Sequence, residues 1–147
     1  MWGIIPAAGL GSRIQPLAFS KELLPVGSRH DDEAGQERPR AVSEYLVERL
    51  VLAGATKLCF VIAPGKSDIL NYYGAAYGPA AIAYVVQPRA GGLCDAIFRA
   101  APLIDPAEAG FVGVEGGGGA IGGALWPESR RKSLVFLGPE PACLIIS

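Results

Sequence analysis

The segment that follows the first apolar run combines glycines with two cations. "GLGSRIQPLAFSKELLP", residues 9–25, begins with Gly9 and Gly11 and then supplies Arg13 and Lys21. A glycine-rich turn lets backbone N–H groups approach an anion without obstruction by side chains. The guanidinium of Arg13 suits phosphate oxygens, and the ammonium of Lys21 adds a point charge. The segment therefore predicts an electrostatic clamp for phosphate groups, of the kind that phosphoryl transfer requires.

Two common phosphate-binding motifs do not match this chain. A dinucleotide-binding fingerprint needs a third glycine at position 14, which holds Ile14. A Walker A loop at "PGKS" (64–67) needs a glycine at position 60, which holds Phe60. We therefore interpret 64–67 as the start of a helix. For residues 9–13, a tight strand-to-helix turn with a surface arginine remains the alternative.

The elements that must position the clamp alternate between strands and helices. Apolar runs predict buried strands at 3–8, 57–63, 81–88 and 111–114. Apolar residues at helical spacing predict helices at 41–54, 67–74 and 92–104. This order is typical of an α/β fold, Rossmann-like, with a largely parallel sheet covered by helices. Ligands bind at the carboxyl ends of such strands, where the loops 9–13 and 87–92 are expected.

Two segments do not fit the alternation. Residues 27–40 are polar and without periodicity, and we predict an exposed loop there. "EGGGGAIGG" (115–123) has six glycines in nine residues, too much backbone freedom for a helix or strand. The chain is therefore divided into an α/β domain, 1–114, and a glycine-rich tail, 115–147. Apolar residues recur at 134–137, but the sequence indicates no partner element for them.

Composition narrows the class of protein. The chain has 147 residues, enough for one domain with a core, and a formal net charge of −1. No basic excess suggests nucleic-acid binding, and no apolar run is long enough to span a bilayer. The start lacks the pattern of a signal peptide. Cys59, Cys94 and Cys143 are far apart and His30 is the only histidine, so we expect reduced thiols in a cytoplasmic protein and no zinc site.

Two separated motifs resemble one family. "IIPAAGLGSRIQPLAFSKELLPV" is similar to the signature of the sugar-1-phosphate nucleotidylyltransferases, G-x-G-[ST]-R-x-x-P followed by P/S-K-x-L-L-P. "VVQPRAGGLCDAIFRAAPLI" resembles that family's Q-P-x-x-x-G-L-x-x-A element. Glucose-1-phosphate uridylyl- and thymidylyltransferases are the most similar in appearance, and the isoprenoid-pathway cytidylyltransferases are a near relative. The resemblance, which spans residues 3–114, implies the nucleotide-diphospho-sugar transferase fold.

The resemblance also implies a reaction and a set of site residues. A sugar 1-phosphate, with glucose 1-phosphate as the expected one, would join UTP or dTTP and release pyrophosphate. Arg13 would hold the departing pyrophosphate, and Lys21 the α-phosphate and the incoming sugar phosphate. Gln87 would read the pyrimidine through its amide. The remaining contacts to the nucleotide would come from Gly9, Leu10, Gly11, Ser12 and Gly92.

The expected metal site is the part of the family pattern that the chain alters. Family members hold Mg²⁺ with a carboxylate at the end of the fourth strand, where this chain has Glu115 followed by glycines. The half with the sugar pocket is missing, so the chain is expected to be a truncated form, and an exposed sheet edge makes a homo-oligomer plausible. Two alternatives remain: an inactive nucleotide-binding module, and a structural domain whose glycine loop is only a turn. We interpret Asp95 as a generic acidic residue of a helix start.

Overall fold

The chain folds around one mixed sheet. The computed structural model describes residues 1–31, 35–104, 110–113 and 134–137, and the side chains of the last two segments are not described. The sheet has the order β5-β6-β4-β1-β7-β8, and every neighbouring pair is parallel except β5–β6. Its strands are β1 (Trp2–Ala7), β4 (Lys57–Ile62), β5 (Ala76–Tyr77), β6 (Ala80–Val86), β7 (Gly110–Gly113) and β8 (Leu134–Leu137). The predicted α/β fold with a largely parallel sheet is confirmed.

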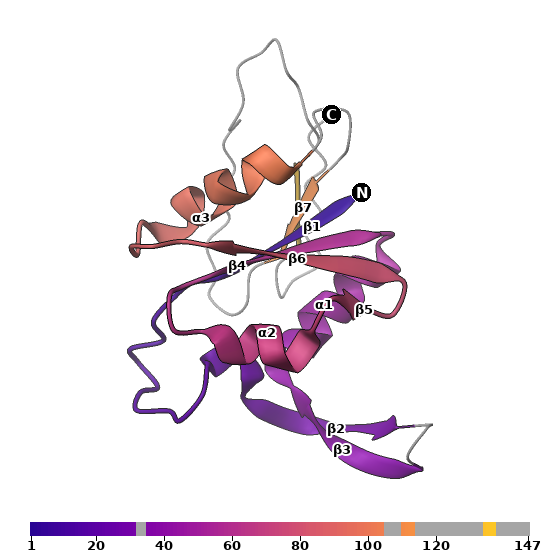
Figure 1. Cartoon of the computed structure of the whole chain (residues 1–147). Coiled ribbons are helices and arrows are strands. Elements are labelled where there is room, and N and C mark those ends of the chain that lie inside the picture. Colours follow the sequence, from indigo (N-terminus) through magenta and orange to yellow (C-terminus); the bar gives the residue numbers. More distant parts are fainter. Residues whose placement is uncertain (32–34, 105–109, 114–133, 138–147) are drawn as a thin grey trace.

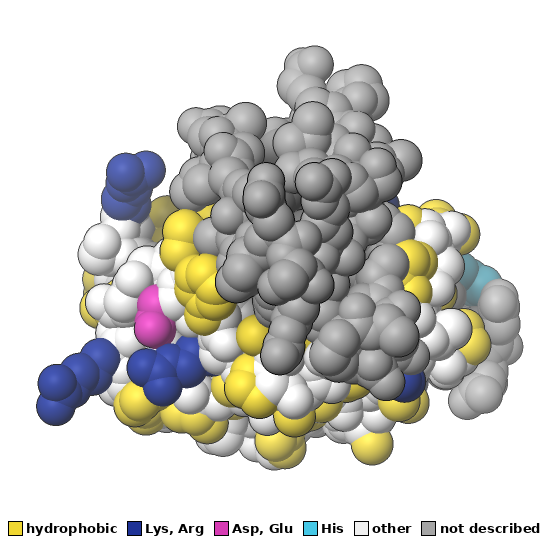
Figure 2. All heavy atoms as spheres, turned by 90° about the horizontal axis from the view of Figure 1, so that it is seen from above, with side chains coloured by type: hydrophobic (Ala, Val, Ile, Leu, Met, Phe, Trp, Pro, Cys, Tyr) yellow, Lys and Arg dark blue, Asp and Glu magenta, His cyan; other side chains and the backbone are white. Residues whose placement is uncertain are grey.

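Helices cover both faces of this sheet. The helices α1 (Val42–Leu52) and α2 (Ser67–Tyr73) lie on one face, and α3 (Gly92–Ala100) lies on the other (Figure 1). Two short 3-10 helices, η1 (Lys21–Leu23) and η2 (Ala101–Leu103), complete the described helical segments. Seen from above, on the side of α3, most of the visible lysines and arginines lie at the left edge of the view, next to an acidic side chain (Figure 2).

The central strand β4 shows why continuous apolar runs became strands. Alternate side chains of a strand point to opposite faces, and both faces of β4 are covered. Leu58, Phe60 and Ile62 pack in one core cluster with side chains of α1 and α2. Cys59 and Val61 pack in a second cluster with side chains of α3. A strand buried on both faces has no polar position to alternate with, hence the unbroken run.

The segment 27–40 is not a loop, and the sequence prediction for it is wrong. It forms most of an antiparallel hairpin of β2 (Pro25–Asp31) and β3 (Gln36–Ala41), which stands outside the main sheet (Figure 1). Most of its residues are exposed, so it has no buried face that would impose an alternating pattern. The hairpin contacts α1 through Tyr45, whose hydroxyl donates to the carbonyl of Val26 at 2.9 Å. The guanidinium of Arg40 lies 3.9 Å from the centre of the Tyr45 ring.

The sheet also gains a strand from the glycine-rich tail. Residues Leu134–Leu137, for which the sequence indicates no partner, pair with β7 in parallel register. Most of the segment 115–147 lies outside the described residues, so the proposed division into domain and tail stays a prediction.

The structure describes two of the three cysteines, as well as the helices that could be compared with a membrane span. Cys59 and Cys94 are both free, and burial raises the pKa of the Cys59 thiol to about 12. Cys143 lies outside the described residues. Within the described part of the chain, no helix has the length and apolar character needed to cross a membrane. A cytoplasmic location and a homo-oligomer both stay predictions.

Phe60 tests the central packing. Its side chain is fully buried, and its ring centroid lies 4.9 Å from that of Tyr73 and 5.8 Å from that of Tyr84. We expect Phe60→Ala to lower the free energy of unfolding by about 3–5 kcal/mol, because it leaves a cavity between sheet and helix. Urea unfolding followed by circular dichroism measures this. The control Leu52→Ala, at a side chain that is 80% exposed, should cost under about 0.5 kcal/mol. Equal losses in both variants would contradict the assigned core.

Candidate functional site

The two loops singled out in the sequence meet at the carboxyl edge of the sheet. They follow β1 and β6, which flank β4 and run parallel to it. A cavity of about 210 Å³ lies between them. Its lining comes from both loops and from the start of α3: Pro6, Ala8, Gly9, Gln87, Ala90, Gly92, Leu93 and Ala96. The topology therefore brings residues about eighty positions apart in sequence into one site.

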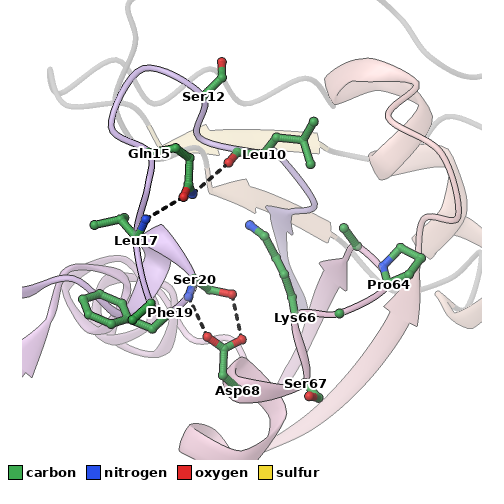
Figure 3. Close-up of a pocket in the computed structure, with 13 residues that line it drawn as sticks. Leu10, Ser12, Gln15, Leu17, Phe19, Ser20, Pro64, Lys66, Ser67 and Asp68 are labelled. Atoms are coloured by element: carbon green, nitrogen blue, oxygen red, sulfur yellow. Dashed lines mark hydrogen bonds between the residues drawn. The ribbon is translucent and has the colours of Figure 1, made fainter.

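A second cavity, of about 640 Å³, borders the glycine loop elsewhere. It is lined by side chains of the loop 10–20 and by residues 63–68 at the start of α2 (Figure 3). Gln15 fastens this loop, since its amide donates to the Leu10 carbonyl at 3.2 Å and accepts from the Leu17 N–H at 2.7 Å. The predicted residues thus separate: Gly9, Gln87 and Gly92 line the smaller cavity. Leu10 and Ser12 line the larger one.

The two glycines are explained by Lys21. Gly11 has φ +64°, and a Cβ placed there would lie 2.9 Å from Cδ of Lys21. A Cβ on Gly9 would lie 3.8 Å from Cε of the same lysine. The stem of Lys21 therefore runs along the glycine turn, and a side chain at position 11 would be both strained and in collision. The structure confirms that Gly9, Gly11 and Lys21 lie together.

Lys66 is the central residue that the sequence interpretation missed. Its ammonium donates to the carbonyls of Ala7 and Gly9, both at 2.7 Å, and to the Glu22 carboxylate at 2.8 and 3.0 Å. Figure 3 shows its side chain directed from the start of α2 toward the glycine loop. The segment 64–67 is thus more than a helix start. A lysine at a helix start carries no local signal of such contacts, because they depend on residues distant in sequence.

Lys66 occupies two backbone carbonyl groups at the glycine loop. A carbonyl directed toward an anion would repel it, and Lys66 holds the carbonyls of Ala7 and Gly9. The N–H groups of Leu10, Gly11 and Ser12 have no hydrogen-bond partner among the described residues. Unpaired amides beside occupied carbonyls are the arrangement that binds a phosphate group.

The buried carboxylate of Glu22 lies between two ammonium groups, those of Lys66 and Lys21. Glu22 is buried, and its carboxylate lies 2.8 Å from the Lys66 ammonium and 3.1 Å from that of Lys21. Two cations therefore share one anion beneath the loop. Arg13 is exposed at the turn, and no hydrogen bond or ion pair joins its side chain to another described residue.

A carboxylate from α2 fixes the segment that carries Lys21. Asp68 accepts from the Ser20 N–H at 2.6 Å and from the Ser20 hydroxyl at 2.7 Å (Figure 3). Partial burial would raise the pKa of Asp68, but hydrogen bonds from Ser20 and Ile69 outweigh it and lower that pKa. This contact joins the start of η1 to α2 and therefore fixes the position of Lys21 relative to Lys66.

At the other loop, Gln87 is buried and held in place. Its backbone N–H donates to the Ile62 carbonyl at 2.8 Å. Its side-chain amide nitrogen donates to the Gly92 carbonyl at 3.2 Å and to Oδ2 of Asp95 at 2.7 Å. Asp95 is therefore more than a generic acidic residue of a helix start, since it binds a candidate site residue directly.

The described residues alone do not fit a divalent cation. No group of three or more His, Cys, Asp or Glu side chains among them is arranged to hold a metal. The carboxylate of Glu22 is engaged by Lys21 and Lys66, and that of Asp68 by Ser20. The predicted ligand Glu115 lies outside the described residues.

Comparison with curated proteins gives a partial match. No model of a known protein family matches the chain. A provisionally named UTP–glucose-1-phosphate uridylyltransferase of Methanocaldococcus jannaschii is 36% identical over 76 residues. The match covers 50% of this chain and 23% of that protein. The chain therefore spans about a quarter of the length of this curated relative.

Solved structures show the same fold. A crystal structure of UDP-glucose pyrophosphorylase complexed with UDP-glucose matches with a TM-score of 0.55 and 25% identity, over 70% of this chain and 41% of that one. A UDP-glucose pyrophosphorylase from Acinetobacter baumanii matches with a TM-score of 0.57 and 23% identity, over 71% and 41%.

Lys66 supplies the first test of the site. We expect Lys66→Met to lower the free energy of unfolding by about 2–3 kcal/mol, because the buried Glu22 carboxylate keeps only Lys21 as a partner and two carbonyls lose their donor. Adding Glu22→Gln should recover part of that loss by removing the buried charge that has lost its closest partner. Urea unfolding of both variants measures the difference. A loss below about 1 kcal/mol in the single variant would contradict the assigned ion pair.

Asp68 gives a pH-dependent test. Because its pKa is lowered in the folded state, its contribution to stability is full above the unfolded-state pKa and is lost as pH falls through the folded-state pKa. Asp68→Asn should cost about 1–2 kcal/mol at pH 7, and the gap to the unaltered chain should narrow below about pH 4. Urea unfolding at several pH values checks this, and a gap independent of pH would rule out the ionised contact.

The mostly parallel sheet with its covering helices agrees with these comparisons. The resemblance to the sugar-1-phosphate nucleotidylyltransferases that the sequence motifs predict is confirmed, over a chain that covers only part of its relatives.

Proposed function

We propose that this chain binds a nucleoside triphosphate and provides the nucleotide half of a sugar-1-phosphate nucleotidyltransferase. The proposed reaction joins a sugar 1-phosphate, with glucose 1-phosphate as the first candidate, to UTP or dTTP and releases pyrophosphate. The observation that carries the proposal is the glycine loop, where Lys66 binds the carbonyls of Ala7 and Gly9 while the N–H groups of Leu10, Gly11 and Ser12 have no hydrogen-bond partner among the described residues. The name of the uridylyltransferase relative supports the choice of substrates.

The smaller cavity suits the base of the nucleotide. It joins the glycine loop to Gln87 and Gly92, so a base lying there would have its phosphates near the unpaired amides. Gly92 has φ +83° and no Cβ to obstruct a flat ring. The buried amide of Gln87 supplies a polar group that can recognise the edge of a pyrimidine.

The proposed reaction requires little covalent chemistry from the protein itself. An oxygen of the sugar phosphate attacks the α-phosphorus in line, the bond from that phosphorus to the bridging oxygen breaks, and pyrophosphate leaves with the electron pair. In the proposal, Lys21 stabilises charge on the α-phosphate and the sugar phosphate, and Arg13 holds the pyrophosphate. Positioning and charge stabilisation of this kind account for most of the catalysis of phosphoryl transfer.

We also propose Mg²⁺ as the cofactor, with Glu115 as one of its ligands. A bound Mg²⁺ would neutralise part of the triphosphate charge. Because the described residues hold no metal cluster, they leave this part of the proposal to Glu115 and to residues outside the described part.

A non-catalytic nucleotide-binding module is the second candidate. It is favoured by the sequence, in which Glu115 and glycines occupy the position where the family resemblance leads us to expect the metal-binding aspartate. Both candidates require triphosphate binding at the glycine loop, and only the first requires turnover.

Arg13 tests triphosphate binding. We expect Arg13→Ala to weaken UTP binding about tenfold or more, since a hydrogen bond to a charged group contributes about 1.5–3 kcal/mol. Isothermal titration calorimetry measures it, with Arg49→Ala, at an exposed arginine of α1, as the matched control. Equal affinity of both variants would count against the clamp.

A pyrophosphate-release assay then separates the two candidates. It uses glucose 1-phosphate and Mg²⁺ with UTP, dTTP, CTP or ATP. Turnover with UTP or dTTP supports the enzyme, and UTP binding without turnover supports the module. Neither binding nor turnover would overturn both and favour a purely structural domain.

A further inference from the structure

The amide of Gln87 is held by two acceptors. Its nitrogen has two hydrogens, and these face the Gly92 carbonyl at 3.2 Å and Oδ2 of Asp95 at 2.7 Å. The residue is only 3% exposed and lines the smaller cavity. Both hydrogens of the amide are therefore engaged inside the protein, and the oxygen is the atom that remains for a ligand.

Asp95 is itself confined beside this amide. A Cβ added to Gly91 would lie 2.8 Å from Cβ, Cγ and Oδ2 of Asp95, so the glycine permits a close approach of the loop to the carboxylate. On the other side, Nε of Arg99 lies 3.4 Å from the same Oδ2, one helical turn further along α3. The hydrogen bond from Gln87, together with Arg99, lowers the pKa of Asp95. The carboxylate is thus ionised at neutral pH.

An ionised carboxylate decides which way the amide faces. A carboxylate can only accept hydrogen bonds, and so can the Gly92 carbonyl. If the amide of Gln87 turned over, its oxygen would face two acceptors and lose both hydrogen bonds. That loss, for a buried polar group, is large enough to hold the amide in one orientation.

We propose that Asp95 is a positioning residue that fixes the Gln87 amide with its oxygen toward the ligand, and so selects uracil or thymine over cytosine. The inference rests on the proposed function, because it assumes that the base lies in the smaller cavity. Asp95 touches no substrate in this scheme and acts through Gln87.

The selection follows from the edges of the bases. Uracil and thymine carry a ring N–H between two carbonyl groups, and a fixed amide oxygen accepts from that N–H. Cytosine has an unprotonated ring nitrogen at the same position, so two acceptors would face each other. A site built to pair with a donor rejects an analogue that lacks it, since a buried polar group is then left unpaired.

Replacing the carboxylate by an amide should release this constraint. In Asp95→Asn, the side chain can donate as well as accept, so it no longer opposes a Gln87 amide that turns over. Only the Gly92 carbonyl, the longer of the two contacts at 3.2 Å, then favours the original orientation. The shape of the side chain is nearly unchanged. The substitution therefore alters the direction of the hydrogen bond more than the packing.

The experiment measures the affinity for UTP and for CTP by calorimetry in the unaltered chain and three variants. We expect the unaltered chain to prefer UTP about tenfold or more. Asp95→Asn should reduce that preference about threefold or more, chiefly by strengthening CTP binding, while the Gly92 carbonyl retains the rest. Gly91→Ala, which displaces Asp95 sterically, should also reduce it. The control Arg99→Gln, which removes a neighbour of Asp95 but leaves the carboxylate, should keep the preference within about twofold.

The outcomes separate the inference from the proposed function. UTP binding with the same UTP-to-CTP preference in a folded Asp95→Asn chain overturns the role of Asp95 and leaves the proposed function standing. No preference for UTP in the unaltered chain also overturns it. If the unaltered chain binds no UTP at all, the proposed function falls and the inference falls with it. Circular dichroism of each variant confirms folding, and Gly91→Ala provides the second route if Asp95→Asn does not fold.

Discussion

The ammonium of Lys66 is the interaction on which the candidate site depends. It lies 2.7 Å from the carbonyls of Ala7 and Gly9 and 2.8 Å from the carboxylate of Glu22. Transfer of an ammonium and a carboxylate from water to a protein interior costs several kcal/mol for each ion, unless both are paired and hydrogen-bonded. Here one lysine satisfies the carboxylate and two carbonyls together. The end of β1, the segment η1 and the start of α2 are thereby joined at one atom.

The same cluster makes the glycine loop and Lys21 a single physical unit. The lysine stem lies where a side chain at Gly11 would be, so the loop can adopt its path only without that side chain. Asp68 holds Ser20, the residue before Lys21, and belongs to the same helix that begins after Lys66. The glycine motif and the motif around Lys21 are thus parts of one clamp. Asp68 of α2 and Lys66, which precedes α2, hold that clamp in place.

The base side and the phosphate side of the site differ in how they are built. The phosphate side depends on charges and unpaired amides around Lys66, which would attract any anion of suitable size. The base side depends on one buried amide with a fixed direction, which carries information about the edge of a ligand. The likeness to UDP-glucose pyrophosphorylases covers 70% and 71% of this chain and 41% of the chains of these two solved structures.

The sequence alone predicted four of the six strands of the sheet, its covering helices and the placement of both loops at the carboxyl ends of strands. Long apolar runs such as that of β4 are readable because burial on both faces excludes polar residues. The glycine motif, Lys21 and Gln87 were readable because their chemistry is local. The hairpin of β2 and β3 was missed, since its mostly exposed strands impose no pattern.

Only the tertiary structure decided the contacts within the site. Lys66 binds Glu22 across 44 positions and the Gly9 carbonyl across 57, and no local pattern records such a pairing. The contact of Asp95 with Gln87 spans 8 positions, but it depends on how the loop turns at Gly91 into α3. The burial pattern is a property of one segment, and the apolar and polar residues of that segment are enough to predict it. The direction of a hydrogen bond is a property of two segments, and it exists only once the sheet has brought them together.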